Sequence, residues 1–362
     1  MKIVQLLPEL NEGGVERGTM ELSRELVKLG HESIVISAGG KLTRQIEADG
    51  GKHIALDVCS KNPFTALFRM IKLRKLFKEL EPDILHARSR VPAWLTYWAN
   101  KKLQLPFVTT VHGFNSVSTY SAVMTKGDRV ICVSSAIKSY IQEYYRTDEK
   151  KITVIPRGID LEKFNLKNID HDFIDVFIQK YQLNDKTIVT SVGRVTQLKD
   201  LETFIHAIAI AKDTIPNLIG LIVGGVREDK QNYFESLKIL AKELRVDEQI
   251  IFTGSQSQVA EIYALSDVVV SSSKKPESFG RSVAEAIAMN TPVVATEHGG
   301  VLDIIREGEN GYFYAVGDGR RLAKLILQCN ELNFNGHDYI SKNFSLEQMV
   351  DKTVENYKGI LR

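Results

Sequence analysis

Residues 276–300 read PESFGRSVAEAIAMNTPVVATEHGG and place a turn, a helix, a strand and a second turn in immediate succession. Phe279 and Gly280 form the first turn, and after it apolar residues recur at the spacing of a helix that packs against a sheet. The apolar run TPVVATE then predicts a buried strand, which two glycines follow. A helix followed directly by a buried strand is typical of a parallel α/β sheet.

The same alternation runs through the rest of the chain. Further strand-like runs read KIVQLLP, ESIVISA, DILHAR, FVTTVHG and RVICVSS in the first part, and TIVTSVGR, LIGLIVGG, IIFTGS, DVVVSSS and GYFYAV in the second. Helical spacing separates them, and the pattern pauses over residues 154–165. We therefore expect an α/β protein with two doubly wound, Rossmann-like domains. The domains are predicted at 1–164 and 165–343, with a last helix in 344–362 that returns to the first domain.

Composition and charge exclude several classes of protein. The chain has 362 residues and a net charge of +2, and no run approaches the roughly 18 consecutive apolar residues of a membrane span. Residues 1–10 lack the shape of a signal peptide, so we expect a cytoplasmic protein. Residues 1–160 hold 24 Lys and Arg against 17 Asp and Glu, but the basic residues lack the aromatic interleaving that favours nucleic-acid binding.

Glu277 and Glu285 flank the predicted N-terminus of the helix that follows Gly280. The free N–H groups of a helix start suit a pyrophosphate, whereas ionised carboxylates only accept hydrogen bonds and suit hydroxyl groups. A nucleotide sugar has this layout, with ribose hydroxyls, a diphosphate and sugar hydroxyls in series. The alternative is that both glutamates only complement the helix dipole.

Two other strand exits carry candidate ligand-binding residues. Arg194 and Lys199 follow TIVTSVG, where their charges suit a diphosphate, although exposed cations at a helix start would look the same. Gly13 and Gly14 in LLPELNEGGVERG let the backbone approach a ligand closely. A tight turn explains this glycine pair equally well, and the G-x-G-x-x-G spacing of a dinucleotide site is absent.

The stretch ESFGRSVAE resembles the E-x7-E signature of retaining glycosyltransferases of family four, whose GT-B fold has two facing Rossmann-like domains with a cleft between them. The resemblance covers nearly the whole chain, because GGVE, HARSR, VTTVHG, VICVSS, PRGIDLEKF, GRVTQLKD, PVVATEHGG and EGENGYFY match in order and spacing. It implies a retaining transferase that moves a sugar from a nucleotide donor to a cell-surface glycan or lipid-linked acceptor, as in lipopolysaccharide or polysaccharide assembly.

The resemblance also implies roles in donor binding and catalysis for individual residues, with Arg194, Lys199, Glu277 and His112 as the catalytic ones. Glu285 would accept hydrogen bonds from the ribose hydroxyls and Glu277 from the donor sugar. Arg194 and Lys199 would bind the diphosphate as it leaves. His112 would lie by the anomeric carbon, although without the family it reads as a core histidine at a strand end.

Other residues complete the donor site that the resemblance implies. Gly13 and Gly14 would approach the donor phosphate or the acceptor from the first domain. Phe279, Gly280 and Ser282 belong to the helix start that would bind the diphosphate. Many relatives carry a smaller or apolar residue in place of Arg281, whose side chain could add a contact to the donor.

Two features of the first domain concern the acceptor and the membrane. Arg88 and Arg90 follow the strand DILHA and suit a phosphate or an acidic sugar, with surface solubility as the competing explanation. Residues 63–80 predict a helix with an apolar stripe of Phe64, Leu67, Phe68, Ile71, Phe77 and Leu80, bordered by Arg69, Lys72, Arg74, Lys75 and Lys78. Such a basic amphipathic helix can lie on anionic lipid at the inner face of the cell membrane, whereas packing on a sheet explains the stripe equally well.

No cofactor is expected beyond the nucleotide-sugar co-substrate, with a UDP-sugar favoured and a GDP- or ADP-sugar open. We expect no metal ion, because no D-x-D motif in a metal-binding context appears and fixed cations can take the metal's role. A nucleotide-sugar epimerase or a disaccharide synthase could share the fold. The chain lacks the dinucleotide-binding fingerprint of a dehydrogenase. A sugar-binding protein without catalytic activity would not need both glutamates and both cations.

Overall fold

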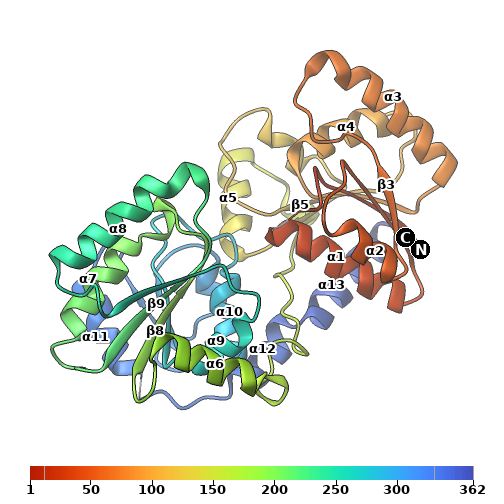
Figure 1. Ribbon diagram of the computed structural model, residues 1–362. Coiled ribbons are helices and arrows are strands. Elements are labelled where there is room, and N and C mark those ends of the chain that lie inside the picture. The colour runs from red at the N-terminus through yellow and green to blue at the C-terminus, as the bar shows by residue number, and fades with distance from the viewer. Residues whose placement is uncertain (12, 330, 362) are drawn as a thin grey trace. The chain divides into compact units, whose positions relative to one another are not determined.

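The computed structural model describes residues 1–11, 13–329 and 331–361, which form two compact units (Figure 1). The N-terminal unit comprises Met1–Gly158 with Leu346–Arg362, and the C-terminal unit comprises Ile159–Ser345. The division falls at Gly158 and not at residue 164, because Ile159 bonds through its backbone N–H to Phe344 O at 2.8 Å and forms a β-bridge with Ser345.

The N-terminal unit is built on a parallel sheet of seven strands in the order β3-β2-β1-β4-β5-β6-β7. Its elements are β1 (Lys2–Leu6), α1 (Gly14–Lys28), β2 (Glu32–Ser37), α2 (Thr43–Ala48), β3 (Lys52–Ala55), α3 (Pro63–Leu80), β4 (Ile84–Ala87), α4 (Arg90–Asn100), β5 (Phe107–Val111), β6 (Arg129–Cys132), α5 (Ser135–Tyr145), β7 (Ile152–Val154) and α13 (Leu346–Leu361). The sequence pattern did not indicate β3 and β7, because these short edge strands are only partly buried and lack a long apolar run.

The C-terminal unit is built on a parallel sheet of six strands in the order β10-β9-β8-β11-β12-β13. Its elements are α6 (His171–Tyr181), β8 (Thr187–Val192), α7 (Leu201–Ala211), β9 (Leu218–Val223), α8 (Gln231–Glu243), β10 (Ile250–Gly254), α9 (Val259–Leu265), β11 (Val268–Ser271), α10 (Arg281–Ala288), β12 (Val293–Thr296), β13 (Gly311–Tyr314), α11 (Gly319–Cys329) and α12 (Gly336–Phe344). Helices α7, α8 and α11 cover one face and α6, α9, α10 and α12 the other (Figure 1). The predicted α/β class with two Rossmann-like sheets is confirmed.

Each sheet has one point at which the order of strands reverses direction. In the N-terminal unit it lies between β1 and β4, and in the C-terminal unit between β8 and β11. Ligands of open parallel sheets bind beyond the carboxyl ends of the strands at such a point. The chain leaves β1 toward Gly13, β4 toward Arg88, β8 toward Arg194 and β11 toward Glu277. The fold therefore places candidate residues at the switch point of each sheet.

Helix α13 is the last helix of the chain and belongs to the N-terminal unit, where it lies beside α1 (Figure 1). Its buried side chains Val350, Val354 and Tyr357 pack with Ile3 of β1 and Leu22 of α1. This cluster covers one side of the sheet with a segment from the far end of the sequence.

Helix α3 departs from the packing expected for its apolar stripe. Its buried residues are Arg69, Leu73 and Phe77, whereas Phe64, Leu67, Phe68 and Ile71 are exposed. The predicted stripe is therefore divided, because Phe77 is buried whereas four other members are exposed, and Arg69, expected at its border, is buried. The helix packs on α4 through its other side, and the exposed apolar residues face away from the core.

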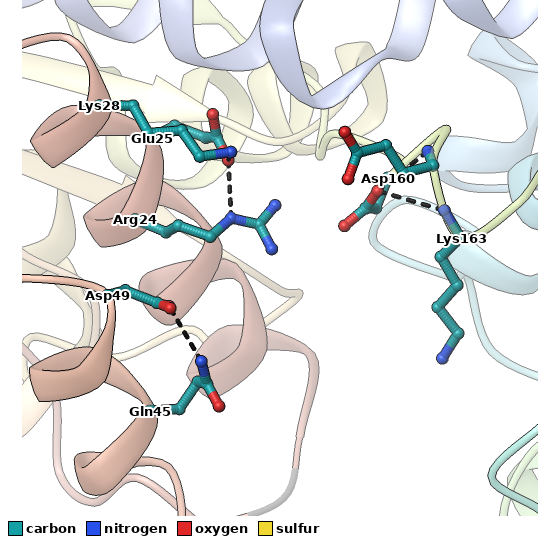
Figure 2. Close-up of polar contacts among 8 residues, drawn as sticks. Arg24, Glu25, Lys28, Gln45, Asp49, Asp160 and Lys163 are labelled. Carbon is teal, nitrogen blue, oxygen red and sulfur yellow. Dashed lines mark hydrogen bonds and ion pairs between the residues drawn. The ribbon is translucent and has the colours of Figure 1, made fainter.

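Surface polar contacts accompany both units (Figure 2). On α1, Arg24 Nε donates to Glu25 Oε1 at 2.7 Å, and on α2, Gln45 Nε2 donates to Asp49 Oδ1 at 2.8 Å (Figure 2). In the C-terminal unit, Asp160 Oδ1 accepts the backbone N–H of Lys163 at 3.4 Å. Exposed pairs of this kind contribute little to stability. Within the described part of the chain, no helix is long and apolar enough to cross a bilayer.

Candidate active site

In the C-terminal unit, the exit of β8 positions the two predicted cations. Arg194 is exposed just beyond the strand, and Lys199 ends a short 3-10 turn before α7. Gly193 makes room for the Lys199 side chain, because a Cβ there would lie 2.8 Å from Lys199 Cε. Ser272 at the end of β11 donates its hydroxyl to Lys199 O at 2.7 Å, so the turn is fixed to the neighbouring strand.

Lys199 forms an ion pair with the first of the two glutamates. Its Nζ lies 2.6 Å from Glu277 Oε1, which also accepts the hydroxyl of Ser273 at 2.7 Å. Burial opposes ionisation of Glu277, but the charge of Lys199 and these hydrogen bonds outweigh it and lower the pKa of the carboxyl. Glu277 is therefore a carboxylate that accepts hydrogen bonds at neutral pH.

The second glycine turn, Gly299–Gly300, holds the backbone that carries Glu277. Gly300 donates its N–H to Glu277 O at 2.7 Å, and Gly299 forms a β-bridge with Glu277. A Cβ at Gly299, whose φ is +78°, would collide with Glu277 O, and one at Gly300 would lie 2.6 Å from Phe279 Cα. Only glycine allows these two segments to approach so closely.

Helix α10 begins at Arg281 after Gly280, which has a φ of +97°. A Cβ at Gly280 would lie 2.6 Å from Val301 Cγ1, so the turn depends on this glycine. Phe279 is buried against Phe344 with ring centroids 6.1 Å apart, and Ser282 is half-buried. The side chain of Phe279 therefore anchors the helix start in the core, and the first turn of α10 presents backbone N–H groups that lack intrahelical partners.

Glu285 lies one turn into α10 and is held from two sides. Arg281 Nε donates to Glu285 Oε1 at 2.8 Å, and Tyr263 of α9 donates its hydroxyl to Oε2 at 3.2 Å. Burial and then the adjacent Glu285 raise the pKa of Tyr263 well above its ordinary value, so the phenol keeps its proton. These contacts fix the orientation of the Glu285 carboxylate.

In the N-terminal unit, the exits of β4 and β5 and the start of α4 surround a cavity of about 260 Å³. Arg88 is buried and donates from Nη1 to Gln5 Oε1 at 3.1 Å. Burial lowers the pKa of Arg88 to about 10, which still leaves it charged at neutral pH. Arg90 donates from Nη1 to Ser121 Oγ at 3.2 Å. Both predicted acceptor-side arginines line the cavity with His112 and Glu16.

His112 follows β5 and has two shielded ring nitrogens that lack hydrogen-bond partners among the described residues. Burial, followed by the positive charges of Arg88 and Arg157, keeps the pKa of His112 well below 6.5. The ring is therefore neutral at physiological pH, with one nitrogen able to donate and the other able to accept. A buried polar side chain with unmet hydrogen-bonding capacity next to a cavity is typical of a binding site.

A hydrogen-bonded chain lies behind this cavity. His86 Nδ1 is 2.7 Å from the hydroxyl of Tyr357 on α13, and His86 Nε2 is 2.6 Å from Thr110 Oγ1. His86 precedes Arg88 by two residues and Thr110 precedes His112 by two, so each pair shares one face of its strand. The C-terminal helix thus ties together the two strands that carry Arg88 and His112.

Comparison with known proteins decides the family. A family model described as Glycosyltransferase Family 4 matches residues 12–163, and one described as Glycosyl transferases group 1 matches residues 173–344. A glycosyltransferase from Rickettsia africae has a crystal structure that matches with a TM-score of 0.91 and 32% identity over 100% of this chain and 98% of that one. The chain belongs to the group 1 glycosyltransferases.

Two other known proteins are similar to this glycosyltransferase at lower sequence identity. N-acetyl-alpha-D-glucosaminyl L-malate synthase of Bacillus anthracis is 24% identical over 382 residues, which is 98% of this chain and 96% of that protein. The structure of HepE from Anabaena in complex with UDP has a TM-score of 0.86 and 20% identity over 99% of this chain and 100% of that one. This likeness supports the GT-B fold.

The structure of the glycosyltransferase also places the predicted glycines of the N-terminal unit. Gly13 precedes α1 in an extended conformation, and Gly14 is the first residue of the helix. A Cβ at Gly14 would collide with Nη1 of Arg157. Arg157 was not among the predicted residues, because the sequence segment PRGIDLEKF looks like a linker and gives no sign that its arginine returns to the β1 exit.

Several other residues that support the candidate site of the glycosyltransferase lack a local sequence signal. Ser273 and Tyr263 bond the two glutamates, and Lys274 Nζ lies 3.1 Å from Asp200 Oδ1 beside the Lys199 turn. The partners of Tyr263 and Lys274 lie on other elements, and Ser273 lies in the same segment as Glu277 but in no motif that marks it. The described residues contain no group of three or more His, Cys, Asp and Glu placed to hold a metal ion.

Proposed function

We propose that this glycosyltransferase transfers a sugar from a nucleotide-sugar donor, with retention of the anomeric configuration and without a metal ion. The observation that carries the proposal is the arrangement in the C-terminal unit, where Lys199 pairs with Glu277 just before the start of α10 and Glu285 is fixed inside that helix. Cations and a helix N-terminus suit a diphosphate, and the carboxylates suit hydroxyl groups on either side of it.

Each residue then has a distinct task in the C-terminal unit. Glu285 accepts hydrogen bonds from the ribose and Glu277 from the donor sugar. Arg194 and Lys199 balance the negative charge that develops on the diphosphate as its bond to the anomeric carbon breaks. The electron pair of that bond stays on the phosphate oxygen. The acceptor oxygen bonds to the anomeric carbon on the same face, and its proton passes to the departing phosphate.

The N-terminal unit supplies the acceptor side in this proposal. Arg88 and Arg90 line a cavity that suits an acceptor with a phosphate or an acidic sugar. His112 is neutral and has unmet hydrogen-bonding capacity for a sugar hydroxyl. We place the acceptor among cell-surface glycans or lipid-linked glycans, as in lipopolysaccharide or polysaccharide assembly, and the enzyme in the cytoplasm at the inner face of the cell membrane.

A UDP-sugar is the favoured donor, and the fold shared with UDP-bound HepE supports this choice. The test is calorimetric titration of UDP, GDP and ADP into the native enzyme and Glu285→Ala, with and without EDTA. We expect one nucleotide to bind selectively, independently of EDTA, and about 10-fold or more weaker in the variant, because a hydrogen bond to a charged group contributes about 1.5–3 kcal/mol. Binding that ignores Glu285 would contradict the donor site, and binding that requires a metal would contradict metal independence.

A further inference from the structure

Helices α3 and α4 of the N-terminal unit enclose an apolar groove of about 470 Å³ that lies apart from the cavity with His112. Its lining is dominated by aliphatic and aromatic side chains, which include Leu67, Met70, Val91, Trp94, Leu95 and Trp98. The buried Arg69 also lines it, with Nη2 bonded to Asn62 O at 3.0 Å. A concave apolar surface of this size is typical of a small-molecule site.

The groove opens onto an exposed apolar ridge on α3. Phe64, Leu67, Phe68 and Ile71 occur at the i, i+3, i+4 and i+7 positions and are 93%, 63%, 61% and 51% exposed. Leu67 belongs to both features, since it lines the groove and remains largely exposed. Single exposed apolar residues are normal in proteins, but a continuous ridge that leads into an apolar groove marks an interaction surface.

The charge around the ridge is almost entirely positive. Residues 61–80 contain six Lys and Arg but only one acidic residue, Glu79. Lys72 lies over the ring of Phe68 at 4.6 Å, and Lys101 lies over the ring of Trp98 at 4.3 Å. These cations therefore sit at the edge of the apolar surface. Long basic side chains beside exposed aromatic rings complement anionic head groups above a hydrocarbon layer.

We propose that the α3–α4 groove binds one hydrocarbon chain of an anionic membrane lipid, while the cations of α3 and Lys101 contact the lipid head groups. The apolar ridge enters the interface, and Leu67 and Trp98 form the entrance for the chain. This inference rests on the proposed function in one respect, which is that the enzyme works at a membrane. It adds a lipid-binding site in the α3–α4 groove. It does not depend on the donor site.

Both tryptophans of the chain, Trp94 and Trp98, line the groove, so intrinsic fluorescence reports on it directly. The experiment titrates the full chain with phosphatidylglycerol vesicles whose acyl chains are either brominated or unmodified. Bromine quenches tryptophan only at short range. We expect strong quenching by the brominated vesicles and little response to vesicles of phosphatidylcholine alone, because the surface is cationic.

Leu67→Glu tests the groove entrance, and the variant should fold because Leu67 is 63% exposed. We expect it to weaken vesicle binding about 10-fold or more, since it replaces an apolar side chain at the groove entrance by a carboxylate that anionic head groups repel. Ile239→Glu is the matched control, because Ile239 is 56% exposed on α8 of the other unit. We expect this control to bind vesicles as the native enzyme does.

Three results would overturn the groove proposal. The enzyme could fail to bind anionic vesicles, it could bind them with unquenched tryptophans, or Leu67→Glu could leave the quenching unchanged. A lipid-free dimer that Leu67→Glu converts to a monomer in sedimentation would assign the groove to a second copy of the chain. A failure of nucleotide binding with quenching intact would overturn the donor site alone, so the two proposals are tested separately.

Discussion

Lys199 Nζ lies 2.6 Å from Glu277 Oε1, although the two residues are separated by 78 positions in the sequence. Lys199 comes from the exit of β8 and Glu277 from the segment between β11 and α10, so the pair spans the switch point of the C-terminal sheet. A cation and a carboxylate are thereby fixed side by side at the place where a ligand of this fold is expected.

The first prediction concerns the charge of Glu277. Glu277→Gln keeps the size of the side chain but removes the charge, so we expect the rate of sugar transfer to fall about 10²–10³-fold. Nucleotide affinity should not fall, because the change removes a negative charge beside Lys199. Steady-state kinetics and calorimetry measure the two effects. Ser273→Ala removes one hydrogen bond and should have a smaller effect on the rate. A parallel loss of nucleotide affinity in Glu277→Gln would instead assign Glu277 to nucleotide binding.

The second prediction compares two glycines that have nearly the same positive φ. Gly299 has a φ of +78° and Gly308 a φ of +77°, but a Cβ would meet Glu277 only at Gly299. Gly308→Ala should cost about 1–2 kcal/mol from backbone strain alone. Gly299→Ala should cost about 1–3 kcal/mol more because of overpacking, and should reduce transfer. Urea unfolding and activity assays measure both. Equal losses in the two variants would mean that the contact with Glu277 has no energetic weight.

The third prediction is a pH dependence of stability from His86 and His112. Burial is the main reason that the pKa of each ring lies well below 6.5 in the folded chain. At a pH below about 6.5 the unfolded chain therefore binds more protons than the folded chain. Stability should therefore fall as the pH drops from 6.5 toward the folded pKa values, by about 1.4 kcal/mol per pH unit for each ring. Denaturant unfolding between about pH 8 and about pH 5 measures this slope.

His112→Asn should reduce that slope, because it removes one of the two groups that resist protonation. His206→Asn is the control, since His206 is an exposed residue on α7 of the other unit. A slope that His112→Asn leaves unchanged would contradict the prediction for this ring.

The fourth prediction concerns the bond between Tyr357 and His86. Tyr357→Phe should destabilise the N-terminal unit by about 1–3 kcal/mol, because it leaves a buried ring nitrogen without its partner. Tyr144→Phe on the exposed side of α5 is the matched control and should be nearly neutral. Thermal and urea unfolding measure the difference. A neutral Tyr357→Phe would show that the chain from α13 to the sheet is not needed for stability.

The local sequence pattern determined the class of fold and the positions of most candidate residues. Apolar runs of strand length alternate with helical spacing, and this periodicity depends only on neighbours along the chain. The same pattern located Arg88, Arg194 and Glu277 after strands, and a parallel sheet brings the carboxyl ends of its strands to one edge. Edge strands β3 and β7 lacked the signal because they are only partly buried.

The tertiary structure alone decided which residues meet and which stay exposed. The partners of Lys199 and His86, and the tyrosine that bonds Glu285, come from other elements, so no local spacing could indicate them. Four apolar residues of α3, Phe64, Leu67, Phe68 and Ile71, remain exposed because the helix buries Leu73 and Phe77 instead. Periodicity along the chain does not decide which of these residues pack. Burial, pairing and protonation depend on neighbours in space, whereas secondary structure depends largely on neighbours in sequence.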